Sequence, residues 1–249
     1  MRKIRVFVTD SDLFQSMQIK LCDNDFDYLT KVMRKKVNDE IYIFNGIDGE
    51  FKAIITSIEK RFLILTIVEK VAELKKSPNI TLVFAPVKNV GIDFVASKAV
   101  ELGAARLQPV ITQRTIVDKI NYDRFKANIK EALEQCERND FAEILEIKKL
   151  ERFLNEDSKE KIFILCDESG QGLQAKEFLP KIKTENKEIV ILIGPEGGFS
   201  ESEFAKMRLL NNLYSLSLGP RILRADTAMI AALALVQEFL GDFNLKSNF

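Results

Sequence analysis

Residues 193–199 read Ile-Gly-Pro-Glu-Gly-Gly-Phe, and residues 218–224 read Leu-Gly-Pro-Arg-Ile-Leu-Arg. They follow strand-like runs at 189–193 and 213–218, and the continuous apolar run at 189–193 is typical of a strand that is buried on both faces of a sheet. The first stretch leads into residues 200–203 (Ser-Glu-Ser-Glu), a capping box that predicts the start of a helix. We therefore expect two buried strands, each ending in a glycine-bearing loop.

These two loops predict a ligand site. In open α/β sheets ligands bind beyond the carboxyl ends of the strands, and glycine lets the backbone approach a ligand closely. Neither loop has the Gly-Lys-Ser/Thr of a Walker A sequence or the spacing G-x-G-x-x-G, so a phosphate cradle fits poorly. A pocket of main-chain groups for a neutral, adenine-type ligand fits better. Plain turn chemistry explains either loop alone, and a joint site is favoured because both loops end buried strands.

Strand-like runs alternate with segments of helical periodicity through the second part of the chain. Strands are expected at 80–84, 106–111, 162–166, 189–193 and 213–218, and helices at 90–102, 125–136 and 226–240. Gly103 is expected to end the first of these helices, and Phe94 and Phe125 are expected in the core. The alternation predicts a parallel α/β sheet, and the rarity of threaded loops favours an ordinary doubly wound order.

The first seventy-odd residues are β-rich. Short β-branched runs at 40–44, 51–58 and 62–68, with turn residues such as Asn45-Gly46, predict a small barrel. Residues 26–37 carry apolar side chains at helical spacing. The polar segment 73–78 ends in proline and predicts a boundary. Two domains are therefore expected, at 1–72 and 78–249.

The composition excludes several kinds of site. The 249 residues include 37 basic and 37 acidic side chains, so a nucleic-acid partner would need a local basic patch. The absence of histidine excludes Ser-His-Asp catalysis and histidine-ligated metals. The three cysteines lack C-x-x-C spacing and are interpreted as isolated reduced thiols. No apolar run reaches the roughly 18–20 residues that cross a bilayer, so a soluble, cytoplasmic protein is expected.

Taken together, the two loops resemble the signature of the RsmE family, the 16S rRNA (uracil-N3)-methyltransferases of the SPOUT superfamily. Residues 98–103 (Lys-Ala-Val-Glu-Leu-Gly), 113–115 (Gln-Arg-Thr) and 131–138 resemble further segments of that family. So do residues 28–34 near the N-terminus, although Tyr28 stands where the family usually has histidine. Ala225-Asp226 replaces its usual Thr-Glu before Thr227.

The resemblance implies a fold and a reaction. It implies a PUA-like β-barrel that binds RNA, followed by a SPOUT trefoil-knot methyltransferase domain whose knot includes the loops at 194–200 and 217–224. It implies S-adenosylmethionine (S-adenosyl-L-methionine) as the cofactor, 16S rRNA of the small ribosomal subunit as the substrate, and a homodimer, with no metal and no membrane. The implied cofactor-binding residues are Ile193, Gly194, Pro195, Glu196, Gly197, Gly198, Leu218, Gly219, Ile222, Leu223, Thr227 and Ala228.

Methylation at N3 requires the loss of a uracil proton, which a base or a nearby cation promotes. Without histidine, the candidates for this catalytic role are Arg224, Arg221 and Asp226. The alternatives are ion pairs or helix caps for the two arginines, with the structural role preferred for Arg221. For Asp226 the N-cap of the last helix is the favoured alternative. Glu196 is a candidate neighbour of the sulfonium or a structural loop carboxylate.

Four basic residues are candidates for RNA contacts: Arg114 at a strand end, and Lys31, Arg34 and Lys35, which form a cluster with Lys36. The alternative for Arg114 is a salt bridge, and for the cluster a solvated face. Two other functions stay open. One is a non-catalytic RNA-binding ribosome assembly factor on the same fold, and the other is a SPOUT methyltransferase with another RNA target.

Overall fold

The computed structural model describes residues 3–9, 12–87, 91–117, 119–156, 158–167 and 172–245. The chain forms two compact units, Met1–Lys76 with Leu133–Phe141, and Ser77–Ala132 with Ala142–Phe249. The first unit therefore includes a segment from the middle of the chain, which the sequence pattern does not indicate. Within the described ranges, no helix is long and apolar enough to cross a membrane.

The N-terminal unit contains a five-stranded sheet in the order β1-β3-β4-β5-β2. Its strands are β1 (Arg5–Phe7), β2 (Gln18–Cys22), β3 (Glu40–Phe44), β4 (Glu50–Ile58) and β5 (Phe62–Ala72). Along β5, Leu63, Leu65 and Ile67 are buried and alternate with more exposed neighbours, the period expected of a sheet with one covered face. The three expected strands are confirmed, and Gly46 adopts the positive φ, 80°, that its turn predicted.

The helical segment of this unit differs from the prediction. α1 (Asp23–Asp27) continues as a π-helical turn over Tyr28–Val32, so the helix expected at 26–37 begins and ends earlier. The backbone leaves the helix at Arg34, whose φ is 53°. The amide of Lys35 donates to the carbonyl of Leu29 at 2.9 Å and closes the turn. A positive φ is costly for a residue with a side chain, and apolar spacing alone does not predict it.

An eight-stranded sheet lies at the centre of the second unit, in the order β11-β13-β10-β12-β6-β7-β8, with β9 paired to β7. Its strands are β6 (Ile80–Phe84), β7 (Arg106–Ile111), β8 (Glu143–Ile144), β9 (Lys148–Lys149), β10 (Lys161–Cys166), β11 (Leu173–Gln174), β12 (Glu188–Ile193) and β13 (Leu213–Ser217). The pairings between these strands are parallel. The predicted parallel α/β sheet and its five expected strands are confirmed.

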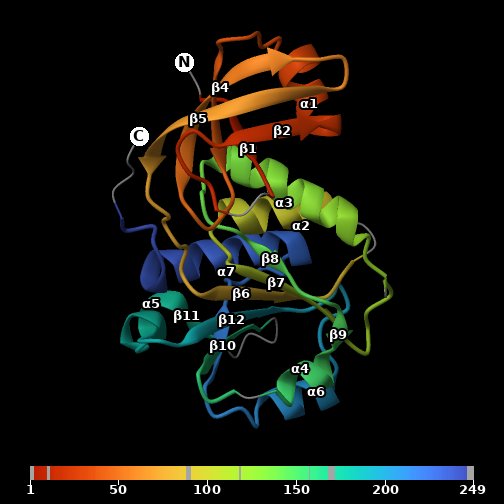
Figure 1. Cartoon of the computed structure of the whole chain (residues 1–249). Helices are drawn as coiled ribbons and strands as arrows, with labels where there is room; N and C mark the ends of the chain where they lie inside the picture. Colours follow the sequence, from red (N-terminus) through yellow and green to blue (C-terminus); the bar gives the residue numbers. More distant parts are fainter. Residues whose placement is uncertain are drawn as a thin grey trace. The chain divides into compact units, whose positions relative to one another are not determined.

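Helices cover both faces of this sheet (Figure 1). The helices are α2 (Ile92–Glu101), α3 (Tyr122–Cys136), α4 (Leu150–Leu154), α5 (Ala175–Phe178), α6 (Glu201–Met207) and α7 (Ala225–Leu240). Val190 and Leu192 of β12 pack with Phe153 of α4 and Met207 of α6, whereas α7 contacts α2 and β12. Burial on both faces explains why the central strands are mostly apolar, although Thr81 of β6 and Gln108 of β7 are buried polar residues.

Two helix ends in this unit form as predicted. Gly103 follows α2 with a φ of 76° and donates to the carbonyl of Val100 at 3.0 Å, while Ala104 donates to Ala99 at 2.9 Å. This pair of bonds is a Schellman motif, which satisfies the last carbonyls of the helix. At the start of α6, Ser200 Oγ accepts from the amide of Glu203 at 3.2 Å, and the predicted capping box is complete.

Three expectations about helices need correction. The N-cap of α7 is Arg224 and not Asp226, because the Arg224 carbonyl accepts the first helical bond, from Ala228 at 2.8 Å. Phe94 is 37% exposed, so its assignment to the core is wrong, whereas Phe125 is fully buried. The helix expected at 90–102 is shorter, because α2 spans Ile92–Glu101. Residue 90 lies outside the described residues.

Candidate functional site

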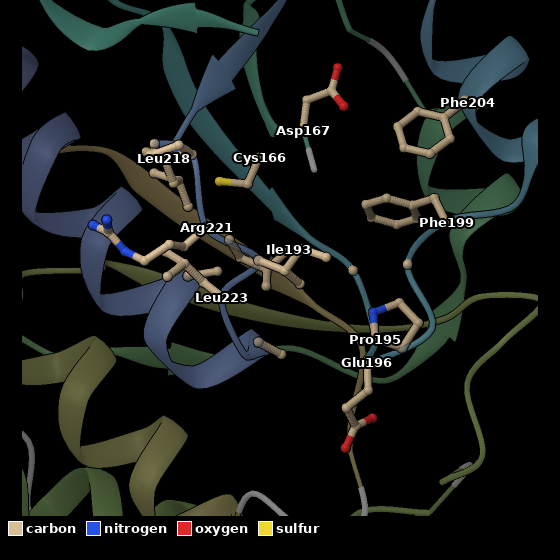
Figure 2. Close-up of a pocket in the computed structure, with 17 residues that line it drawn as sticks. Cys166, Asp167, Ile193, Pro195, Glu196, Phe199, Phe204, Leu218, Arg221 and Leu223 are labelled. Carbon is tan, nitrogen blue, oxygen red and sulfur yellow. The ribbon is translucent and has the colours of Figure 1, made fainter. Parts of the chain in front are cut away.

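A cavity of about 220 Å³ lies at the carboxyl ends of three neighbouring strands, β13, β10 and β12. Both glycine-bearing loops line it, so the two loops form one pocket (Figure 2). The lining includes these residues that the sequence singled out: Ile193, Gly194, Pro195, Glu196, Gly198, Leu218, Gly219, Arg221, Ile222, Leu223 and Ala228. The geometry therefore agrees with the rule that open α/β sheets place ligands at the carboxyl ends of strands.

The first loop turns tightly around Gly198. Its amide donates to the carbonyl of Pro195 at 2.8 Å, and its φ is 67°, a conformation that glycine adopts without steric cost. A Cβ built on Gly194 would lie 3.2 Å from Cε2 of Phe199, because the phenyl ring already fills that space. Glycine at both positions thus has a local structural cause, and the turn exposes main-chain groups to the cavity.

The second loop is more open to solvent. Gly219 has a φ of 102°, and Ile222 is 90% exposed although it lines the cavity. Figure 2 shows the guanidinium of Arg221 pointing away from the rings of Phe199 and Phe204. An exposed apolar side chain at the rim is suited to contact a flat apolar ligand.

Six lining residues were not among the predicted ligand residues: Cys166, Asp167, Phe199, Phe204, Pro220 and Ala225. Cys166 ends β10 and Asp167 follows it, between the two loops in strand order. Burial raises the pKa of the Cys166 thiol to about 12, and the Asp167 carboxylate adds to the rise. The apolar run at 162–166 predicts the strand, but no signal in the sequence indicates that this strand lies between the other two.

The two phenyl rings form one wall of the cavity. Phe199 and Phe204 meet edge to face with 5.8 Å between ring centroids (Figure 2). Phe199 is only 5% exposed and belongs to the core under α4 and α6. Helical spacing after Ser200 indicates that Phe204 faces inward, and the sequence does not distinguish an inward ring in the core from one in a pocket wall.

Four of the predicted cofactor-binding and catalytic residues do not line the cavity: Gly197, Arg224, Asp226 and Thr227. Oδ1 of Asp226 accepts from the amide of Thr227 at 2.7 Å and lies at 3.3 Å from its hydroxyl oxygen. Arg224 is exposed, and its side chain forms no ion pair with the residues that the structure describes. The same holds for Arg221 among the described residues, so the expected ion pairs of both arginines are not seen.

Arg114 contacts the first glycine loop. Its Nη1 donates to the carbonyl of Gly197 at 2.5 Å, and a Cβ on Gly197 would lie 3.4 Å from Cδ of Arg114. Arg114 is exposed and comes from the loop after β7. The alternative of a salt bridge is not seen within the described part of the chain. The arginine instead holds a main-chain carbonyl of the pocket loop.

In the N-terminal unit, the expected basic cluster lies where the helical segment ends. Lys31 pairs with Asp27 at 2.7 Å, and the two side chains are 69% and 53% exposed. Arg34 and Lys36 are exposed and Lys35 is half-buried, so the charges stay accessible to solvent. Surface pairs of this kind contribute little stability, which leaves the cluster available for a polyanionic partner.

Comparison with known proteins matches both parts of the chain. Residues 75–237 match the family described as "RNA methyltransferase domain", and residues 21–68 match the one described as "RNA methyltransferase PUA domain". The "ribosomal RNA small subunit methyltransferase E" of Rickettsia conorii is 30% identical, over 95% of this chain and 96% of the relative. The protein of that name from Buchnera aphidicola is 31% identical, over 96% of this chain and 94% of the relative.

Two solved structures are similar over almost the whole chain. One is a ribosomal RNA small subunit methyltransferase E from Neisseria gonorrhoeae bound to S-adenosyl methionine, with a TM-score of 0.85 and 29% identity. The other is a protein from Legionella pneumophila in complex with the bound cofactor SAM, with a TM-score of 0.86 and 28% identity. In each case the similarity covers 98% of this chain and 100% of the other.

Proposed function

Because this chain belongs to the RsmE family of RNA methyltransferases, with a PUA domain before an α/β methyltransferase domain, we propose that it methylates N3 of a uridine in 16S rRNA. The methyl donor is S-adenosylmethionine, and the substrate is the small ribosomal subunit or its rRNA.

The observation that carries this proposal is the cavity shared by the two glycine loops. Ile193, Leu218, Leu223 and Ala228 give it apolar walls, and the loop backbone supplies a few polar groups. Apolar walls with a few placed hydrogen-bonding groups are suited to an adenosine-like ligand. A phosphate site would present clustered amides or cations. This cavity differs because it combines a few hydrogen-bonding groups with apolar walls.

The charges at the cavity also fit this donor. Asp167 and Glu196 line it, and carboxylates favour the positive charge of a sulfonium or of an amino group. When bound, S-adenosylmethionine supplies a methyl group on a sulfonium that is ready for transfer. The chain's own part is to hold the donor between the two loops, to exclude water with Phe199 and Phe204, and to align the uridine.

We assign the stabilisation of the uracil anion, which forms when N3 loses its proton, to the cationic side chains of the second loop. Arg224 and Arg221 carry guanidinium groups without an ion-pair partner among the described residues, so they are available to an anion. A positioned cation stabilises the uracil anion that precedes methyl transfer. A role for Asp226 as the base stays a prediction, and so does a place for Gly197 and Thr227 in the cofactor site.

The RNA is assigned to basic residues in both units. Lys31, Arg34 and Lys35 lie on the PUA domain and Arg114 lies beside the pocket loop, and each side chain can neutralise a phosphate. These contacts fix position on the RNA and carry no base specificity. Selection of one uridine therefore requires contacts other than these phosphate contacts.

We also propose that the protein forms a homodimer and that its chain is knotted at the two loops. α7 presents Ile230, Ala234 and Leu235 only half-buried, an apolar stripe that suits a second copy in a homodimer. The chain passes from β12 through α6 to β13 on the far side of β10, a crossing that is consistent with a trefoil knot at the two loops. We propose that this enzyme of rRNA processing and ribosome biogenesis acts in the cytoplasm.

Nucleoside mass spectrometry tests the proposal. In a strain that lacks the gene, 16S rRNA should lose 3-methyluridine, and the wild-type gene should restore it. An unchanged level of 3-methyluridine would reject this target and leave an enzyme with another RNA substrate. Calorimetry with S-adenosylmethionine is the second arm, because no binding at millimolar donor would favour a non-catalytic assembly factor on the same fold.

A further inference from the structure

Glu203 makes two contacts of different kinds with its two carboxylate oxygens. Oε2 accepts from the amide of Ser200 at 2.8 Å, which completes the capping box of α6. Oε1 accepts from the amide of Gln113 at 2.8 Å, across 90 positions of the chain. A capping box needs only the first contact. The second contact ties the start of α6 to the loop that follows β7.

The loop at residues 112–115 is itself rigid. The amide of Thr112 donates to Oγ1 of Thr115 at 2.9 Å, and the two threonine hydroxyls lie 2.8 Å apart. Gln113 adds a side-chain bond from Nε2 to Oγ of Ser202 at 2.9 Å. Arg114 reaches in the other direction to the Gly197 carbonyl at 2.5 Å. One loop thus contacts both Gly197 in the glycine turn and the start of α6 that follows it.

That turn and α6 carry the wall of the cavity. Phe199 precedes Ser200 and Phe204 follows Glu203, so any shift at the start of α6 moves both rings. The turn before Phe199 contains Gly197 and Gly198, which restrict the backbone less than any other residue. Without an external tie, donor binding would have to order this segment, and that ordering opposes binding.

We propose that Glu203 is a positioning residue for the methyl donor, which acts with Arg114 to hold the glycine turn and the two phenyl rings in the binding geometry. The inference rests on the proposed function, since it takes the cavity as the donor site. Glu203 does not line that cavity and is 7% exposed, so its effect is indirect, through Ser200 and Gln113. Its charge stabilises both amide contacts, since hydrogen bonds to ionised acceptors are the stronger ones.

Glu203→Gln tests the inference, because the amide keeps one oxygen for Ser200 and cannot accept from both backbone amides. In calorimetry the variant should bind S-adenosylmethionine about tenfold more weakly than the wild type, with a higher KM for the donor and a kcat within about twofold. Glu201→Gln is the matched control, since it removes the same charge from an exposed position in the same helical turn. It should keep the wild-type affinity.

The outcomes separate the two proposals. Wild-type protein that does not bind the donor would overturn the proposed function and this inference with it. A wild type that binds, with a Glu203→Gln variant of equal affinity, would overturn the inference alone. A variant whose KM is unchanged, and whose kcat falls only in proportion to its folded fraction, would show that Glu203 only caps the helix, which also overturns the inference. If Glu203→Gln does not fold, Arg114→Ala at the exposed end of the tie decides, and unchanged donor affinity there overturns the inference.

Discussion

The ring of Phe199 fills the space into which a side chain at Gly194 would project, with 3.2 Å between the ring and a Cβ built there. Both residues line the cavity, and Phe199 also packs in the core beneath α4 and α6. The pocket loop and the hydrophobic core thus share one side chain. A change of one methyl group at the loop is therefore transmitted to the wall of the cavity.

Gly194→Ala should weaken donor binding by about tenfold, because the ring has to move by a few tenths of an ångström and overpacking of this kind costs about 1–3 kcal/mol. Isothermal titration calorimetry measures the dissociation constant. Gly91→Ala is the control, since a Cβ at Gly91 meets nothing within 4 Å. Equal affinities of Gly194→Ala and the wild type would show that the ring adapts and that this wall does not contact the donor.

Arg224→Ala should lower turnover at least tenfold and leave donor affinity within about twofold, because loss of an electrostatic stabiliser raises the barrier without altering the apolar walls. Single-turnover methylation of small subunits from a strain lacking the enzyme gives the rate. Arg152→Ala, at an exposed position of α4, should leave the rate unchanged. Turnover by the Arg224 variant at the wild-type rate would remove this residue from the mechanism.

Arg5→Met should destabilise the N-terminal unit by about 3–5 kcal/mol, because it leaves the buried carboxylate of Glu50 without its partner. Arg5 donates to Glu50 at 2.8 Å and to the carbonyls of Leu133 and Arg138 at 2.7 and 2.9 Å. Urea unfolding followed by circular dichroism measures the loss. Lys31→Met, which breaks an exposed pair, should cost at most about 1 kcal/mol, and equal losses in both variants would contradict the argument.

Cys166 should resist alkylation at pH 8.5 far more than Cys22 does, because only the thiolate is nucleophilic and burial raises the pKa of Cys166 to about 12. Cys22 is exposed and serves as the internal control. Peptide mass spectrometry after a timed pulse of iodoacetamide compares the two in one sample. Equal labelling of both thiols in the folded protein would contradict a raised pKa of the Cys166 thiol.

The raised pKa of Cys166 also predicts that the protein loses stability at alkaline pH. Above about pH 8.5 the unfolded chain releases the thiol proton while the folded chain retains it, so the free energy of unfolding falls as the pH rises towards 12. Cys166→Ala should therefore flatten this part of the stability profile when urea midpoints are compared between pH 8 and pH 10. A wild-type profile in the variant would indicate that other groups cause the alkaline loss.

Local patterns in the sequence predict much of this fold. The largely apolar runs at 80–84 and 189–193 are strands because they are covered on both faces. The one polar residue in them, Thr81, is buried and hydrogen-bonded to Glu188 and Arg106. Ser200 and Glu203 start α6 because their reciprocal bonds involve only neighbours in the chain. Where a local pattern permits two answers the prediction can fail, and the N-cap of α7 is Arg224 and not the expected Asp226.

The two glycine-bearing loops also allow the ligand pocket to be predicted from the sequence. Glycines at 194 and 219, each after a predicted strand, indicate a pocket of backbone groups, and the loops do line one cavity. The second strand, β13, is not buried as expected, because Leu216 is its only buried residue. The order of strands is a different matter. Buried parallel strands have interchangeable apolar sequences, so nothing in the run at 162–166 tells that β10 lies between β12 and β13. Cys166 and Asp167 enter the cavity only through that order.

The sequence by itself determined which segments are strands, which loops carry glycine, and which family the chain resembles, because each of these depends on residues close together in the chain. Only the tertiary structure decided that Glu203 and Arg114 join the loop after β7 to the pocket turn. Those contacts connect residues 83 and 90 positions apart. Pairings over such distances depend on the packing of the whole sheet, and spacing along a single chain carries no record of them.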